Sequence, residues 1–301
     1  MDSQWSNPLF KQIVIILLIF MAAVGVILFP LRKKNMHLTA AWASLQSWLF
    51  FAPVLFLMLA AGHPWPLLGM TFISLLCAKE FFQLTGMYHR GIFVWCTYIA
   101  ILTLAYSIHK NYFVLYDTSP MIFLGVISLI PIFLNEAKNM LQYMALSLLC
   151  FIFVGWAFMH TARIIVLPNG SFYLIYMILM TELCDNVALT VSRLFGKKKI
   201  VDQITAKRTL EGLIISIVTT TVAAYFLKIL LPADHQMNWW VYGLTAALVG
   251  SVGDLILSVI RRDLGVRDYG IFIIGRGGIL DRMDRLIFVA PIYFYLIYYL
   301  V

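Results

Sequence analysis

Residues 11–30 read KQIVIILLIFMAAVGVILFP, an apolar run in which Lys11 is the only charged residue. A bilayer hydrocarbon core of about 30 Å requires about 20 apolar residues in helical form. Nine further runs of this kind follow, so the sequence predicts about ten membrane-spanning helices. The approximate ranges of those nine runs are 45–62, 65–84, 91–108, 120–134, 139–159, 172–194, 210–231, 239–260 and 284–301.

The composition points to the same class of protein. Of the 301 residues, 62% are hydrophobic and 12% are charged, whereas soluble domains are roughly half apolar and about a quarter charged. This balance excludes a soluble globular enzyme, a disordered chain and a nucleic-acid-binding domain. Because the apolar runs are continuous rather than alternating, we predict an all-α polytopic membrane protein and not a lipid-exposed β-barrel.

The lysines and arginines predict how the helices are oriented. The basic cluster 32–34 follows the first apolar run instead of preceding it, so this run is interpreted as a retained helix and not as a signal peptide. With the N-terminus outside, 18 of the 22 basic residues fall on the inner side, as the positive-inside rule requires. We therefore expect an integral protein of a bacterial inner (plasma) membrane with its site on the cytoplasmic side. The four basic residues on the outer side are Lys11, Lys110, Arg163 and Lys228.

Polar residues concentrate toward the C-terminal end. Residues 1–170 are mostly apolar runs and short turns, whereas 196–209 and 261–285 are longer polar segments, and both fall on the inner side. We predict an N-terminal transmembrane region over 1–170. The remaining part, 171–301, is predicted to be a catalytic transmembrane region with cytoplasmic polar loops.

The stretch 253–285, GDLILSVIRRDLGVRDYGIFIIGRGGILDRMDR, alternates cations, carboxylates and glycines. Guanidinium groups bind phosphates, carboxylates bind Mg²⁺, and glycines let backbone N–H groups approach an anion. Asp254 lies within an apolar helix, where a carboxylate is costly and is a functional candidate by default. Asp281 and Asp284 are three residues apart and therefore share one helix face. These features predict a site for phosphates and a divalent metal ion.

A second polar region begins inside the run 172–194, where Glu182 and Asp185 are also three residues apart. Lys207 and Arg208 come just before the next helix, which Thr209 is placed to cap. The free N–H groups at such a helix start favour an anion. The segment therefore predicts a place that favours an anion.

Structural interpretations of the same residues stay open. The run Lys197–Lys199 is accounted for by topology alone. Glu182 is also compatible with a buried structural network that it forms with Arg193 or with Asp185. Asp284 and Arg285 are compatible with a simple pair on one helix.

Taken together, the motifs resemble the phosphatidate cytidylyltransferases, also called CDP-diacylglycerol synthases. Their C-terminal signature has the form S-x-[apolar]-K-R-x4-K-D-x-G-x2-[apolar]-P-x-H-G-G-[apolar]-x-D-R-[apolar]-D. The family's S-P-x-K-T-x-E-G segment is echoed by residues 205–212, and its G-D-L by residues 253–255. The residues that stand in register with the signature are Ser258, Arg262, Asp268, Gly270, Gly277, Gly278, Asp281, Arg282 and Asp284.

The chain departs from the signature at several positions. Arg261 and Arg267 replace two lysines and keep the charge, whereas Ile274 stands in place of a proline. Arg276 stands in place of a histidine. An arginine cannot act as a base, but its guanidinium can hold a phosphate through two hydrogen bonds.

The resemblance implies metal-assisted cytidylyl transfer from CTP to phosphatidate, giving CDP-diacylglycerol and pyrophosphate. It implies Mg²⁺, with a second cation left open, held by Asp254, Asp281 and Asp185. The implied catalytic residues are Asp254, Asp281, Asp284, Arg276 and Arg282. The implied substrate-binding residues are Lys207, Arg208, Thr209, Ser258, Arg261, Arg262, Asp268, Gly277 and Gly278.

Three alternatives accompany this prediction. An anionic-lipid transporter would use the same acidic and basic groups without chemistry. A catalytically inactive family member would serve as a membrane partner protein. A cytidylyltransferase for another lipid phosphate would keep the chemistry and change the acceptor. The expected partners are CTP, a lipid phosphate and the bilayer, with a homodimer left open and no nucleic acid.

Overall fold

The computed structural model describes residues 4–31, 36–201, 205, 208–264 and 278–300. Within these ranges every regular element is a helix, which confirms the predicted all-α class. The α-helices are α1 Pro8–Leu31, α2 Met36–Ala60, α3 Trp65–Leu84, α4 Gly91–His109, α5 Phe113–Leu134, α6 Met140–Cys150, α7 Phe158–Val166, α8 Gly170–Phe195, α9 Leu210–Phe226, α10 Trp239–Asp263 and α11 Leu280–Tyr299.

Shorter elements connect these helices. The π-helical segment η3, Phe151–Ala157, joins α6 to α7, so that Met140–Val166 forms one continuous apolar stretch. An isolated bridge between Lys199 and Thr209 closes the connection between α8 and α9. The remaining short elements are the 3-10 segments η1 Gln4–Ser6, η2 Met87–His89, η4 Leu227–Leu230 and η5 Ala233–Asn238.

Each of the ten predicted apolar runs falls on helical structure, but the count of ten spans stays a prediction. Among the described residues, eight helical stretches are long and apolar enough to cross a membrane. The apolar part of α2 is shorter, Leu45–Ala60, and the first turns of α11 carry four charged residues. The fifth run, predicted over 120–134, is part of the longer helix α5, Phe113–Leu134. Pro120 and Pro131 both lie inside this helix.

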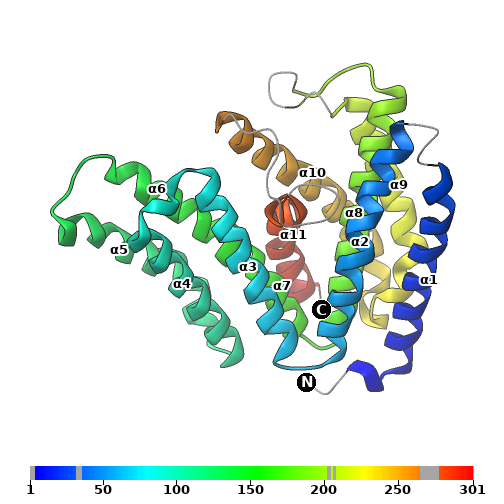
Figure 1. Ribbon diagram of the computed structural model, residues 1–301. Helices are drawn as coiled ribbons and strands as arrows, with labels where there is room; N and C mark the ends of the chain where they lie inside the picture. Colours follow the sequence, from blue (N-terminus) through cyan, green and yellow to red (C-terminus); the bar gives the residue numbers. More distant parts are fainter. Residues whose placement is uncertain (1–3, 32–35, 202–204, 206–207, 265–277, 301) are drawn as a thin grey trace.

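The helices form an elongated bundle in which α11 is central (Figure 1). α11 packs against α10, α7, α3 and α8, and α8 makes extensive contact with α9. α1 and α2 lie on the outer side of α8 and α9, and α4 to α6 form the opposite flank (Figure 1). The start of α1 and the end of α11 both lie in the lower half of the view (Figure 1).

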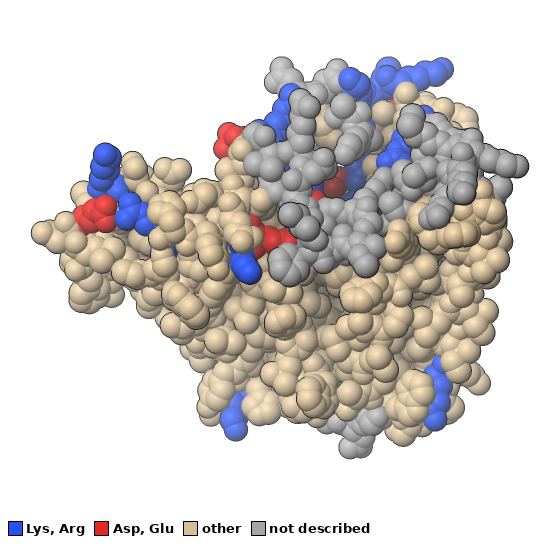
Figure 2. Space-filling model, in the orientation of Figure 1, with Lys and Arg blue, Asp and Glu red and all other residues tan. Residues whose placement is uncertain are grey.

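The surface of the bundle is largely apolar, as expected for a protein that faces lipid. Side chains along α1, among them Ile16, Phe20 and Val26, are exposed although they are hydrophobic. Most Lys and Arg side chains visible in Figure 2 lie along its upper edge, with wide areas below that carry few charged side chains. An apolar exterior with a charged rim is the arrangement of an integral membrane protein.

Candidate functional site

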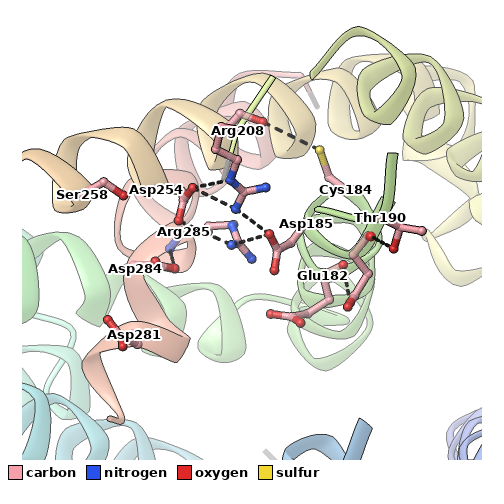
Figure 3. Close-up of polar contacts among 12 residues, drawn as sticks. Glu182, Cys184, Asp185, Thr190, Arg208, Asp254, Ser258, Asp281, Asp284 and Arg285 are labelled. Carbon is pink, nitrogen blue, oxygen red and sulfur yellow. Dashed lines mark hydrogen bonds and ion pairs between the residues drawn. The ribbon is translucent and has the colours of Figure 1, made fainter. Parts of the chain in front are cut away.

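Three arginines and four aspartates meet where α8, α10 and α11 converge. We call this set the arginine–aspartate cluster. Figure 3 shows two of the arginines, Arg208 and Arg285, together with the four aspartates. The aspartates come from α8, α10 and the start of α11, and one arginine comes from the segment that precedes α9. The members of the cluster are Asp185, Arg208, Asp254, Arg261, Asp281, Asp284 and Arg285.

Arg208 links α8 to α10. Its Nη2 lies 2.6 Å from Asp185 Oδ1, and its Nε donates to Asp254 Oδ2 at 2.8 Å. Arg285 of α11 approaches the same two carboxylates, at 2.7 Å from Asp185 Oδ1 and 3.6 Å from Asp254 Oδ1. Two guanidinium groups therefore share two carboxylates (Figure 3).

Arg261 connects the end of α10 to the start of α11. It forms an ion pair with Asp281, and its Nη2 lies 3.7 Å from both Asp254 Oδ1 and Asp284 Oδ2. Nη2 also donates to Ser258 Oγ at 3.1 Å. The predicted shared face of Asp281 and Asp284 is thus confirmed, since both contact Arg261. Asp254 and Ser258 of α10 contact the same arginine.

The cluster is largely removed from solvent. The side chain of Asp284 is 3% exposed, and those of Asp185 and Arg208 are each 13% exposed. Charges at this depth persist only when they are paired, because removing one partner leaves the other buried without compensation. The four carboxylates therefore depend on the three arginines, and the arginines are held in fixed positions.

The local fold that presents Arg208 is set by the next residue. Thr209 is the N-cap of α9, and its hydroxyl accepts a hydrogen bond from the Gly212 N–H at 3.2 Å. Ser192 of α8 lies 3.1 Å from the same hydroxyl. The predicted cap is confirmed, and it fixes the start of α9 against α8 directly beside Arg208.

A small pocket opens beside the cluster, between α8, α9 and α10. Its lining includes Asp185, Arg208 and Arg285 together with the polar side chains of Thr181, Thr209 and Ser251. Charged groups of the cluster thus face a small space next to the start of α9.

The structure brings together most of the predicted site residues that it describes. Asp185, Arg208, Asp254, Ser258, Arg261, Asp281 and Asp284 contact one another, and Thr209 borders them. Arg262 is exposed at the end of α10. The predicted residues Lys207, Asp268, Arg276 and Gly277 lie outside the described residues.

Two predicted residues have other neighbours. The guanidinium of Arg282 lies over the Trp48 ring of α2, 5.9 Å from its centroid. The Trp48 indole N–H donates to Glu182 at 2.7 Å, so Glu182 contacts α2 rather than Arg193. Gly278 lies against the Glu80 carboxylate of α3.

Sequence reasoning missed Arg285 and Glu80 as contributors to this site. Arg285 was interpreted only as a partner within its own helix, and Glu80 was not singled out. Both are ionisable residues on predicted membrane helices, which is by itself a signal of function. That signal does not tell which distant residues they contact.

The donor types of the cluster suit Mg²⁺, which takes one or two carboxylates together with substrate phosphates. Within the described residues, no three His, Cys, Asp or Glu side chains form a group that could hold a metal ion. Asp254 and Asp281 instead both contact Arg261. A cation held by these two carboxylates would take the place of this guanidinium, and metal binding stays a prediction.

Comparison with known proteins gives matches along most of the chain. The model of the cytidylyltransferase family matches residues 42–300. A protein of Escherichia coli (strain K12) named "Uncharacterized protein YnbB" is 26% identical over 254 residues, which cover 82% of this chain and 84% of that protein.

Two similar proteins carry a functional name. The phosphatidate cytidylyltransferase of Staphylococcus haemolyticus (strain JCSC1435) is 33% identical over 165 residues, and that of Staphylococcus aureus (strain COL) is 32% identical over 167 residues. Each match covers 52% of this chain and 60% of the relative. The family match reaches back into α2, well beyond the C-terminal motifs on which the resemblance rested.

Proposed function

The chain belongs to the cytidylyltransferase family, and on that premise we propose that it transfers the cytidylyl group of CTP to phosphatidate. The products would be CDP-diacylglycerol and pyrophosphate. Family membership makes the chain a nucleotidyltransferase, which favours an enzyme over an anionic-lipid transporter. The choice of phosphatidate rests on the printed names of the staphylococcal relatives and on the lipid-embedded position of the site.

The reaction needs no activated side-chain nucleophile. An oxygen of the lipid phosphate attacks the α-phosphorus of CTP, and the bond from that phosphorus to the oxygen bridging to the β-phosphorus breaks. Pyrophosphate leaves with the electron pair of that bond. Because the attacking phosphate is already ionised, catalysis can rest on positioning and on stabilisation of the spread negative charge.

The arginines are the groups that would position the phosphates and stabilise their negative charge. Arg208 and Arg285 are preorganised by Asp185 and Asp254, and both border the pocket beside the cluster. A guanidinium binds phosphate through two parallel hydrogen bonds, and burial strengthens this interaction. The resemblance implies that Asp254, Asp281 and Asp185 hold Mg²⁺, which would neutralise phosphate charge when bound. In the structure these carboxylates are paired with Arg208, Arg261 and Arg285, so a bound cation would take the place of a guanidinium.

The observation that carries the proposal is the burial of three arginines and four aspartates at one end of a membrane-embedded helical bundle. A lipid phosphate reaches this depth from the bilayer, and CTP would reach it from the predicted inner aqueous side. A site for a soluble acceptor would have no need of the surrounding apolar helices.

The test is transfer of label from CTP to lipid. Purified protein in detergent receives phosphatidate, α-labelled CTP and Mg²⁺, and label is counted in the organic phase. We expect transfer by the wild type, loss of transfer in Asp281→Ala, and wild-type transfer in the control Glu136→Ala. Glu136 lies in a partly exposed ion pair with Arg90, and neither residue belongs to the cluster.

A panel of lipid phosphates decides the acceptor. Transfer to another lipid phosphate, with none to phosphatidate, would overturn the proposed substrate and retain the chemistry. Absence of transfer to every acceptor, in protein that is folded and monodisperse, would overturn the enzymatic proposal and favour the inactive family member.

A further inference from the structure

The first turn of α11 is held by a residue of a distant helix. The backbone N–H groups of Ile279 and Leu280 donate to the two oxygens of the Glu80 carboxylate, at 3.0 and 2.8 Å. Glu80 belongs to α3 and is separated from these residues by 199 and 200 positions in the sequence. Its side chain is buried, so water does not satisfy these groups in its place.

This contact replaces a missing cap. The first N–H groups of a helix have no partner within the helix, and a side-chain oxygen at the N-cap position usually accepts from them. The N-cap of α11 is Ile279, which has no such oxygen. The Glu80 carboxylate supplies two acceptors at once, and its negative charge is favourable at the positive end of the helix dipole.

Gly278 makes this arrangement possible. A Cβ atom at this position would lie 2.7 Å from the Cδ of Glu80, closer than real Cβ contacts allow. Gly278 aligns with the second glycine of the signature's G-G pair. Because it has no side chain, it leaves room for the Glu80 carboxylate of α3. This accounts for Gly278 by packing, and the direct substrate contact that the resemblance implies stays a prediction.

The turn held in this way carries the groups of the site. Asp281 and Asp284 follow Leu280 by one and four residues, and both contact Arg261. Arg285 reaches Asp185 and Asp254 from the next turn. A shift or rotation of this helix start would move all of these side chains relative to α8 and α10.

We propose that Glu80 is a positioning residue for the transferase reaction, which fixes the start of α11 and thereby the reactive geometry of Asp281, Asp284 and Arg285. The inference rests on the proposed function and extends it, because it makes α3 of the predicted N-terminal region a working part of the site. Glu80 touches no reacting group and acts only through the backbone of α11.

The first readout is the kinetics of Glu80→Ala and Glu80→Gln, measured per folded molecule in detergent. A misplaced reacting group lowers the rate on the order of 100-fold for displacements near 1 Å. We expect kcat of Glu80→Ala to fall at least about tenfold at saturating CTP, with a smaller fall in Glu80→Gln, which keeps one acceptor oxygen. The control Glu136→Gln makes the same chemical change at a partly exposed carboxylate outside the cluster and should keep the wild-type kcat.

The second readout is independent of activity. Hydrogen exchange of the peptide that covers residues 279–285 should accelerate in Glu80→Ala, whereas the capped start of α9 should keep its protection. If wild-type protein transfers no label to any lipid phosphate, the proposed function fails, but this exchange still decides whether Glu80 holds the turn. If Glu80→Ala does not fold, kcat and hydrogen exchange measured on Glu80→Gln decide the inference instead.

A double-mutant cycle separates positioning from general stability. Gly278→Ala should lower kcat in the wild-type background, where the added Cβ meets the Glu80 carboxylate. In the Glu80→Ala background, where that carboxylate is absent, the same substitution should lower kcat much less. Wild-type kcat in Glu80→Ala, or unchanged exchange of residues 279–285, would overturn the inference. A lower melting temperature with full activity per folded molecule would equally overturn it.

Discussion

Arg208 is the residue on which the geometry of the cluster depends most directly. Its guanidinium reaches Asp185 with one nitrogen at 2.6 Å and Asp254 with another at 2.8 Å. A lysine keeps the charge but offers a single point donor, which cannot serve two carboxylates in the same fixed fork. A positive charge alone is therefore not enough to hold Asp185 and Asp254 in the same way as the Arg208 guanidinium.

We expect Arg208→Lys to lower cytidylyl transfer by on the order of 100-fold, because both the carboxylates and the phosphate lose a bidentate partner. The measurement is kcat/KM for CTP at fixed lipid concentration. Arg90→Lys is the matched control, since Arg90 pairs with Glu136 at 3.4 Å and both side chains are about one-third exposed or more. Equal activity of the two variants would contradict the assigned role of Arg208.

A histidine pair at the end of the bundle opposite the cluster makes the stability of the fold depend on pH. His63, in the turn between α2 and α3, stacks on His109 at the end of α4, with Nε2 and Nδ1 2.9 Å apart. Burial and the neighbouring His109 lower the pKa of His63. The folded state therefore binds this proton at a lower pH than the unfolded state does.

The stability that this shift contributes is present above the ordinary histidine pKa of about 6.5 and is lost as the pH falls toward the folded value. We expect the melting temperature of the wild type in detergent to be lower at acidic than at neutral pH. The difference should shrink in His63→Gln and persist in His89→Gln, which changes an exposed histidine. An identical pH dependence in wild type and His63→Gln would contradict the assignment.

At the scale of elements, the contact between α8 and α9 places Arg208 in the cluster. α9 lies close to α8 at Gly212, where a Cβ would lie 2.7 Å from the backbone oxygen of Ala188 and still closer to the Ser192 hydroxyl. The backbone oxygen cannot rotate away, so α9 must shift. The helix start that carries Thr209 would shift with it.

We expect Gly212→Ala to destabilise the protein by about 1–3 kcal/mol, the usual cost of overpacking, and to lower cytidylyl transfer as well. Gly125 of α5 is the matched control, because a Cβ there meets nothing within 4 Å. Gly125→Ala should be neutral or stabilising by up to about 1 kcal/mol, since alanine is the better helix former. Thermal unfolding in detergent and the label-transfer assay measure both effects.

The sequence predicted elements better than it predicted contacts between them. Each apolar run became helical because the bilayer leaves the backbone no other partner than itself. The Thr209 cap was predictable because its donor and acceptor are only three residues apart in the sequence. The contact between Glu80 and Leu280 was not, because it joins positions 200 residues apart and leaves no local pattern.

At the scale of the whole molecule, the N-terminal helices are part of the site. α2 contributes Trp48, which contacts Glu182 and lies under Arg282, and α3 contributes Glu80. The family match from residue 42 onward includes both helices. The division at residue 170 stays a prediction, but the residues that present the cluster come from both sides of it.

The orientation in the membrane follows from charge and is open to direct test. Lys198 lies in the segment between α8 and α9, and Asp234 lies beyond the other end of α9, which is long and apolar enough to cross the bilayer. Both side chains are exposed, whereas the natural Cys77, Cys150 and Cys184 are buried. Single cysteines at these two positions therefore report opposite sides of the membrane.

We expect Lys198→Cys to react with a membrane-impermeant maleimide only in inside-out vesicles, and Asp234→Cys only in right-side-out vesicles. The reason is the positive-inside rule, which places the basic segment next to the cluster on the cytoplasmic side, where CTP is available. The wild type measures the background from its own cysteines, and detergent-solubilised samples show that each new cysteine is reactive. Labelling of both positions from one side would mean that α9 does not cross the membrane, and reversed labelling would place the cluster on the outer face, away from its nucleotide.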